Sequence, residues 1–341
     1  MDVVTILVAI VVFGVIIFVH ELGHLLFAKK YGVYCYEFSL GMGPKLFSRK
    51  YGETNYSIRA IPIGGFVSMA GENDEGEEAP EGRRLNDVHK LKQAMIIFAG
   101  AFFNFILGFI IIVGINFYIG IGESVPVVGE VLENSVAEEY GIENGYKIIE
   151  VNGKEVIDFD TMVTDINDAK KSGDLNIVFE KNGNIITIDK QDISEDYTIG
   201  ISYDRINVSR NIFMILKNSF AQFISMTVAM FGAFAQLIVK FSTMKDNVGG
   251  PVMIVGEIGR SVEVGFIYLM QMIALLSINL GVVNLLPIPG LDGSKILISI
   301  GEFFTKRDLP RKLYVGLSIG GVIFLLLLMV LITFKDIMNL I

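Results

Sequence analysis

Four long stretches of this chain contain no Asp, Glu, Lys or Arg, and they restrict its fold more than any other feature. They cover residues 3–20, 93–122, 264–291 and 313–334. Each is close to or longer than the ~20 residues that a helix needs to cross a bilayer. Since 52% of the residues are hydrophobic and only 19% are charged, water cannot be the only solvent of the folded chain. The sequence therefore predicts a multi-pass α-helical membrane protein with about four transmembrane helices.

Composition excludes several other classes of protein. The single cysteine, Cys35, excludes a disulfide scaffold and a zinc site built from cysteines. The net charge of −9 argues against nucleic-acid binding. The first apolar stretch has no basic residue before it and no small-residue cleavage site after it, so we interpret it as a retained helix and not as a signal peptide.

Charge is unevenly distributed along the chain. Residues 123–205 contain 19 acidic and 7 basic residues, a net charge of −12. A segment of this charge is predicted to form a separate domain outside the bilayer.

Basic residues near the helix ends predict the orientation. Lys29 and Lys30 follow the first helix, while Arg83, Arg84, Lys90 and Lys92 precede the second. Because such residues favour the cytoplasmic side, the amino terminus and the acidic domain are expected on the outer side. Four further basic residues return the chain to the inside between the last two helices: Lys306, Arg307, Arg311 and Lys312.

One more segment, residues 218–239, also lacks charge. Its apolar run is interrupted by Asn218, Ser219, Gln222, Ser225 and Gln236, which favours an amphipathic helix on the membrane surface. On pattern alone, a fifth transmembrane helix remains the alternative.

The first functional motif is His20-Glu21-Leu22-Gly23-His24, within the first predicted helix. Residues i and i+4 share one face of a helix, so both imidazoles can reach one zinc ion, with Glu21 beside it. This pattern is typical of zinc metallohydrolases. A pair of helix-end histidines without a ligand role is the alternative, but ionisable groups in an apolar span are costly unless they have partners.

Two histidines leave a zinc site short of at least one protein ligand. The remaining histidine, His89, lies in a charged loop, so a carboxylate is expected to complete the site. The best candidate is Asp292, at the end of Asn284-Leu285-Leu286-Pro287-Ile288-Pro289-Gly290-Leu291-Asp292-Gly293. Pro287 and Pro289 predict irregular backbone at membrane depth, which marks a cavity. Alternatively, Asp292 only caps a helix.

Together these motifs resemble the site-2 protease family of intramembrane zinc metalloproteases, and the resemblance covers nearly the whole chain. Residues 56–67 resemble the family's membrane re-entrant β segment, expected at about 54–70, and residues 249–252 resemble the turn before its third helix. The chain departs from a pattern common in the family at Gly290 and Ser294, and neither departure removes a ligand.

The acidic domain resembles a PDZ domain. Residues 128–131, 137–142 and 148–153 predict a strand, a short helix and a strand that ends in an Asn-Gly turn, and residues 174–188 supply two more strands. PDZ domains bind an extended peptide at a sheet edge. A spacer that excludes bulky substrates is the alternative. The chain has room for one such domain, and in this it resembles the single-PDZ bacterial members of the family.

The resemblance implies a function and a set of site residues. It implies one Zn²⁺ per chain held by His20, His24 and Asp292, with Glu21 as the general base for peptide hydrolysis. By the same resemblance, substrate-binding residues are Asn284, Gly64, Gly65 and Phe66, the last three in a strand edge that holds the substrate unwound. The implied partners are membrane proteins with transmembrane helices, such as anti-sigma factors or remnant signal peptides, in some cases already cut by another protease. The implied location is the bacterial cytoplasmic membrane, with the active site toward the cytoplasm.

Shared zinc ligands also bear on the topology. His20 and Asp292 must meet at one zinc ion, and each lies toward the carboxyl end of its helix. Both helices must therefore run inward. A membrane crossing by residues 218–239 would reverse the direction of the helix that leads to Asp292. We therefore expect residues 1–122 to form the first two transmembrane helices, 123–205 the PDZ-like domain, 206–262 peripheral linker helices and 263–341 the last two transmembrane helices.

Two other classes of function remain as alternatives. One is a catalytically silent, PDZ-bearing membrane scaffold, and the other is a zinc transporter. Neither needs a general base, so the presence of Glu21 argues against both.

Overall fold

The computed structural model describes residues 2–72, 79–133, 135–194, 197–239 and 249–340. The chain divides into two compact units, one of Met1–Ile115 with Ser219–Ile341 and the other of Asn116–Asn218. The helices that lie mainly in the first unit, and their bounds, are α1 (Val3–Lys30), α2 (Lys90–Ile119), α5 (Ile212–Val239), α7 (Pro251–Val264), α8 (Phe266–Leu285), α9 (Asp292–Thr305) and α10 (Arg311–Leu340), with a short 3₁₀ turn η1 (Leu85–Asp87) before α2.

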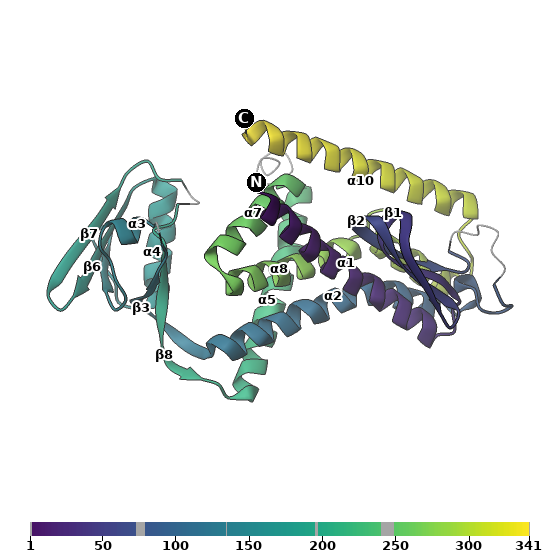
Figure 1. Ribbon diagram of the computed structural model, residues 1–341, viewed down its shortest axis with the longest axis horizontal. Coiled ribbons are helices and arrows are strands. Elements are labelled where there is room, and N and C mark those ends of the chain that lie inside the picture. Colours follow the sequence, from purple (N-terminus) through teal and green to yellow (C-terminus); the bar gives the residue numbers. More distant parts are fainter. Residues whose placement is uncertain (1, 73–78, 134, 195–196, 240–248, 341) are drawn as a thin grey trace. The chain divides into compact units, whose positions relative to one another are not determined.

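Long apolar helices dominate the first unit (Figure 1). Within the described residues, five segments are long and apolar enough to cross a membrane: Val3–Lys30, Lys90–Ile119, Ile212–Leu237, Phe266–Leu285 and Lys312–Asp336. Many of their large side chains are exposed, for example Leu7 and Val11 of α1 and Leu327 and Leu331 of α10. Apolar surface of this extent is stable in lipid and not in water. The chain is therefore a multi-pass membrane protein, as the sequence predicts.

Helices α1 and α8 run in the same direction. Ala9, Val12 and Ile16 of α1 share one apolar cluster with Leu269 and Leu276 of α8. Toward their carboxyl ends, His20 and His24 share a cavity with Leu280 and Asn284. Parallel packing brings the carboxyl ends of the two helices together.

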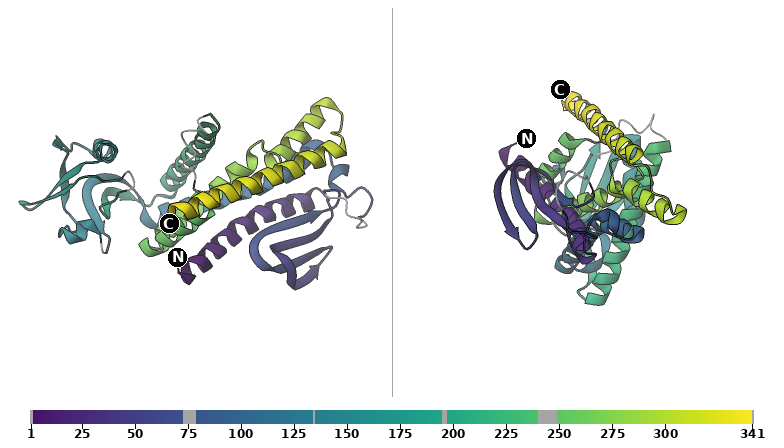
Figure 2. Two further views of the ribbon diagram at one scale, coloured as in Figure 1. Left: turned by 90° about the horizontal axis from the view of Figure 1, so that it is seen from above. Right: turned by 90° about the vertical axis from the view of Figure 1, so that its right-hand side faces the viewer.

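Helix α10 runs in the opposite direction to α1, so that both chain ends lie at the same end of the unit (Figures 1 and 2). Near its start, Asp308 lies 2.8 Å from the Nζ of Lys90, the first residue of α2. Near its other end, the buried Asp336 accepts hydrogen bonds from the backbone N–H groups of Gly250 and Met253, both at 3.1 Å. Asp336 thereby caps α7, whose first N–H groups have no partners in the helix itself.

Helix α5 is the element on which the predicted count of four membrane helices depends. Phe220 and Phe223 of α5 contact the ring of Phe109 of α2, with centroids 6.3 and 5.9 Å apart. The helix runs crosswise to α2 at this contact (Figure 1). Because α5 is nevertheless a fifth helix of sufficient length and hydropathy, the count of four is not confirmed.

A curved antiparallel sheet packs beside α1. It consists of β1 (Cys35–Tyr51) and β2 (Thr54–Met69), so the strand pair begins well before the predicted segment at 54–70. Each strand bends, because Glu37 pairs with both Ser68 and Asn55, while Ser48 pairs with Ser57. Four segments therefore lie side by side in the order 65–69, 35–40, 55–58 and 48–51. Residues 65–69 lie at one end of this order.

The second unit is a small α+β fold. Its sheet has the strand order β7-β6-β4-β3-β8, with β5 paired to β4. The bounds are β3 (Ile121–Val131), α3 (Val136–Glu139), β4 (Lys147–Val151), β5 (Lys154–Glu155), α4 (Phe159–Ser172), β6 (Leu175–Lys181), β7 (Asn184–Lys190) and β8 (Ile201–Ser209). Asn182 and Gly183, both with positive φ, form the turn between β6 and β7.

Candidate metal centre and active-site cavity

The histidine motif lies on a buried face of α1. His20 and His24 are each 7% exposed, since α2 covers them. Gly23 permits this close packing: a Cβ atom there would lie 2.3 Å from the carbonyl oxygen of Ala99. The glycine of the motif therefore allows the backbones of α1 and α2 to touch beside the histidines.

Asp292 reaches the histidines through a sharp break between two helices. Helix α8 ends at Leu285 and α9 begins at Asp292, so the helix stops before Pro287 and Pro289, as predicted. A Cβ atom at Gly293 would lie 2.4 Å from the carbonyl oxygens of Leu285 and Leu286. Only glycine lets the first turn of α9 fold back against the end of α8, and this fold places Asp292 over α1.

Gly290, one of the departures from the expected pattern, has a structural reason. Its φ is +96°, a backbone conformation that residues with a Cβ rarely adopt. A Cβ atom there would also lie 3.1 Å from the backbone nitrogen of Val322 in α10. Gly290 thus lets α10 pack on the loop that leads to Asp292.

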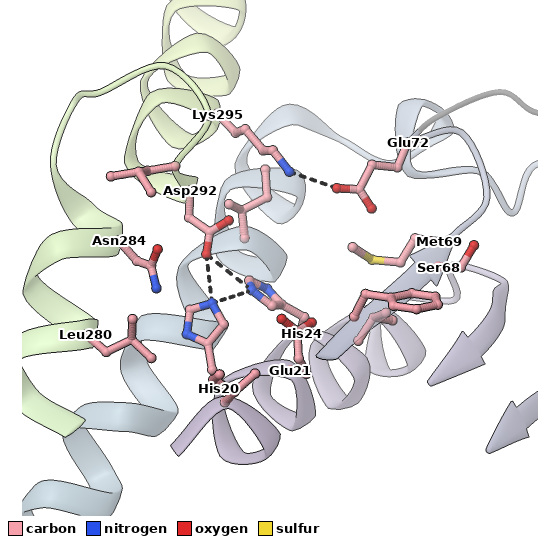
Figure 3. A pocket seen from close by; sticks show the side chains of 16 residues that line it. His20, Glu21, His24, Ser68, Met69, Glu72, Leu280, Asn284, Asp292 and Lys295 are labelled. Carbon is pink, nitrogen blue, oxygen red and sulfur yellow. Dashed lines mark hydrogen bonds and ion pairs between the residues drawn. The ribbon is translucent and has the colours of Figure 1, made fainter. Parts of the chain in front are cut away.

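The three candidate ligand atoms form a nearly equilateral triangle (Figure 3). The Nε2 atoms of His20 and His24 are 3.2 Å apart, and each lies 3.2 Å from Oδ2 of Asp292. Donors at the usual distances from tetrahedral zinc are separated by about 3.3 Å. Oδ2 is buried and faces both imidazole nitrogens. The donor types, their spacing and their convergence on one point all fit a shared zinc ion.

Helix α2 orients both imidazole rings. Nδ1 of His24 lies 2.9 Å from the carbonyl oxygen of Ile96. A carbonyl only accepts, so this contact holds the proton on Nδ1 and leaves Nε2 free to bind a metal. Nδ1 of His20 lies 3.3 Å from the side-chain amide of Asn104. A Cβ atom on Gly100, between these two residues, would lie 2.3 Å from Nε2 of His24.

The sequence analysis missed this contribution of α2. The available signal was Asn104, a side-chain amide within the uncharged stretch 93–122, because a polar group in a membrane helix needs a partner. The close approach at Gly100 has no signal in a single sequence.

A cavity of about 500 Å³ opens beside the three ligands. The other residues predicted for catalysis or substrate binding that line it are Glu21, Phe66 and Asn284. Gly64 and Gly65 are not lining residues. Gly65 packs against Glu21, since its Cβ atom would lie 3.5 Å from Cγ of Glu21, whereas Gly64 packs against Met42. The predicted site residues other than Gly64 thus line the cavity or pack against a residue that does.

The end segment of the sheet forms one wall of the cavity. Phe66, Val67, Ser68 and Met69 all line it, and they belong to the segment at the end of the strand order. The guanidinium of Arg59 lies 5.0 Å from the centre of the Phe66 ring. Glu37 in turn accepts a hydrogen bond of 2.8 Å from Arg59. This chain of contacts holds the Phe66 ring in place.

An ion pair lies beside this wall of the cavity, where Nζ of Lys295 is 2.9 Å from a carboxylate oxygen of Glu72 (Figure 3). Burial favours neutral Lys295, but the charges of Glu72 and Asp292 outweigh burial and hold the pKa of its ammonium above the usual range. The pair connects the turn after β2 to α9. Sequence analysis did not identify either residue.

Comparisons with known proteins identify the family of this chain. The chain matches the description of peptidase family M50 over residues 8–328. It is 35% identical to a candidate zinc metalloprotease of Clostridium perfringens, over 96% of this chain and 97% of that protein. It is 33% identical to one of Clostridium acetobutylicum, over 97% of each chain. Zinc metalloprotease RasP of Shouchella clausii is 32% identical, over 98% of this chain and 99% of that protein. The chain therefore belongs to peptidase family M50, the site-2 proteases, which are zinc metalloendopeptidases.

Proposed function

We propose that this zinc metalloprotease hydrolyses peptide bonds in or near the transmembrane segments of other membrane proteins. The observation that carries the proposal is the position of the three ligand atoms. His20 and His24 belong to a helix long and apolar enough to span the bilayer, yet they line a cavity together with Glu21, Asn284 and Asp292. Polar groups within a membrane-spanning helix are energetically costly, and they mark functional sites.

Each polar residue in the cavity has a proposed role. His20, His24 and Asp292 hold one zinc ion per chain, which when bound supplies Lewis acidity toward water and the scissile carbonyl. Glu21 takes a proton from the attacking water and passes it to the leaving amine. Asn284 offers its side-chain amide to the substrate or to the negative charge that develops on it.

The sheet segment 65–69 is the proposed binding edge for substrate. A helical substrate hides its carbonyl groups in internal hydrogen bonds, so it must unwind before it is cut. An extended segment added beside residues 65–69 would exchange those bonds for bonds to the strand. Gly65 supports this role, because it lies against Glu21 and so places the edge next to the proposed base.

For the topology, we propose four crossings of the bacterial cytoplasmic membrane by α1, α2, α8 and α10, with the site toward the cytoplasm. Asp308 pairs with Lys90 at the start of α2, whereas Asp336 binds Gly250 at the other end of α10. The chain therefore leaves α2 and enters α7 at the same side, so α5 need not cross. The acidic unit then lies outside as a PDZ-like module, which docks or filters substrates that another protease has already trimmed.

Accessibility of single cysteines tests this topology. In a Cys35→Ser background, a cysteine at Glu263, an exposed residue just before α8, should react with a membrane-impermeant thiol reagent added to intact cells. A cysteine at the exposed Arg307 should react only after permeabilisation. The reverse pattern would contradict the proposed orientation.

Cleavage of a defined membrane reporter tests the function. The purified, zinc-loaded chain is reconstituted in vesicles with a single-span reporter, in one form with an unbroken helix and in a second with a Gly-Pro pair near the predicted cut. Cleavage of both, faster for the second form and abolished by a zinc chelator, is the expected result. Absence of cleavage of either form by zinc-loaded protein would refute the proposal.

A further inference from the structure

We propose that Asn104 is a positioning residue for His20, accepting a hydrogen bond from the Nδ1–H of that histidine and so keeping its Nε2 available to zinc. This inference rests on the proposed function, since it assigns a role to a residue outside the ligand set. Asn104 lies in α2 and is 0% exposed. It lines neither the cavity nor a solvent-exposed surface, so it can affect function only through the residues that it contacts.

The two ends of the Asn104 side chain are in contrasting situations. Its Nδ2 lies 3.3 Å from Nδ1 of His20. Its Oδ1 is buried and has no hydrogen-bond partner among the described residues. A buried amide oxygen without a hydrogen-bond partner destabilises the fold. The residue therefore holds an unused acceptor next to the imidazole of a zinc ligand.

The protons on His20 show what this acceptor is for. A histidine that binds zinc through Nε2 carries its proton on Nδ1. That Nδ1–H requires an acceptor, yet the amide Nδ2 that faces it is also a donor. Facing donors repel, so this amide orientation suits only a histidine with its proton on Nε2, which is not a zinc ligand.

A half-turn of the Asn104 amide removes the repulsion between the facing donors. It exchanges Oδ1 and Nδ2, which are nearly equal in size and shape. Oδ1 then accepts from Nδ1–H of His20, and the unpaired oxygen gains its partner. The half-turn does not disturb the backbone of Asn104, whose carbonyl oxygen accepts a hydrogen bond of 2.8 Å from the hydroxyl of Ser277 in α8.

Helix α2 supplies an orienting contact to each of the two histidines. Ile96, Gly100 and Asn104 are spaced four residues apart, so they form one stripe along α2. The carbonyl of Ile96 orients His24, Gly100 lets both rings approach the helix, and Asn104 orients His20. A main-chain carbonyl orients His24, whereas a side chain orients His20. Only the contact to His20 can therefore be removed by mutation.

Zinc affinity of full-length variants tests the inference. Asn104→Leu keeps the size of the side chain but cannot accept, whereas Asn104→Asp can. Loss of a partner of this kind typically weakens metal binding about 10–100-fold. We expect that loss for Asn104→Leu and affinity near that of the wild type for Asn104→Asp, in competition with a chelator. Asn279→Leu is the matched control, because Asn279 of α8 also has a buried amide oxygen that is unpaired among the described residues, and it does not line the cavity.

Nuclear magnetic resonance of ¹⁵N-histidine-labelled protein gives a second measurement. The chain has three histidines, so their signals are few. In zinc-loaded wild type, the Nδ1–H protons of His20 and His24 should both exchange slowly with water. In Asn104→Leu, the His20 proton should exchange faster, while that of His24, bonded to Ile96, should not change.

Two results would overturn the inference: zinc affinity of Asn104→Leu within twofold of wild type, or no gain of Asn104→Asp over Asn104→Leu. If zinc binding by the chain does not depend on His20, that result would instead refute the proposed function.

Discussion

A methyl group added at Gly100 should weaken zinc binding by direct collision with the ligands. The Cβ atom of Gly100→Ala would lie 2.3 Å from Nε2 and 2.6 Å from Cε1 of His24, and 2.8 Å from Cε1 of His20. Ordinary contact begins at 3.4 Å, so the His24 ring, α2 or both must move by roughly 1 Å. That is several times the ~0.2 Å tolerance of metal–ligand distances.

The size of the effect follows from the cost of overpacking. Inserting a methyl group into a tightly packed site typically costs about 1–3 kcal/mol. If zinc binding requires the original ring positions, this cost corresponds to affinity about 5-fold to 140-fold lower, at about 1.4 kcal/mol per tenfold. The zinc-free protein should not be destabilised to the same extent, because Ala is favoured over Gly in a helix by about 1 kcal/mol.

Gly114→Ala is the matched control for this experiment. Gly114 lies on the same helix, and a Cβ atom there would meet nothing within 4 Å. Both variants gain the same helix preference, but only Gly100→Ala collides with the histidines. Zinc affinity is measured by chelator competition, with helix content checked by circular dichroism. Equal affinity in the two variants would refute the claim that α2 fixes the ligand positions.

Three further predictions test separate parts of the account. Asp292→Ala should lower zinc occupancy, measured by elemental analysis, because two imidazoles make an incomplete site; zinc bound with full affinity would mean that the third ligand lies elsewhere. Replacement of residues 125–203 by a short flexible linker should preserve cleavage of a trimmed substrate and permit cleavage of some bulky ones; loss of both activities in a folded, zinc-loaded protein would contradict this division of labour. Burial raises the pKa of the Cys35 thiol to about 12, so at pH 7.5 the native chain should react with iodoacetamide far more slowly than the denatured chain, and equal rates would contradict the burial.

The positions of the ligands follow from the sequence to a large extent. His20 and His24 share a helix face because of their four-residue spacing, and Pro287 and Pro289 end α8 where the irregular loop begins. These are local effects, in which each residue acts on its own few neighbours. The turns and strands of the acidic unit follow in the same way from Asn182 and Gly183 and from the alternation of apolar residues.

Features that depend on contacts between distant segments could not be predicted from the sequence. Strand β1 was missed because Gly41, Gly43 and Pro44 interrupt its pattern, and only pairing with both halves of β2 makes it a strand. The crosswise path of α5 depends on aromatic contacts with Phe109. The pair of Glu72 and Lys295 joins residues 223 positions apart. None of these contacts leaves a periodic signal in one sequence.

The most direct test of the central claim compares wild type with Glu21→Gln in the vesicle assay, with zinc content measured on the same samples. Glu21 lines the cavity but is not one of the three clustered ligands. Replacing its carboxylate by an amide therefore removes the base and leaves His20, His24 and Asp292 in place. The account predicts equal zinc content and cleavage of the membrane reporter reduced to background. Cleavage by zinc-loaded Glu21→Gln at near the wild-type rate would contradict it.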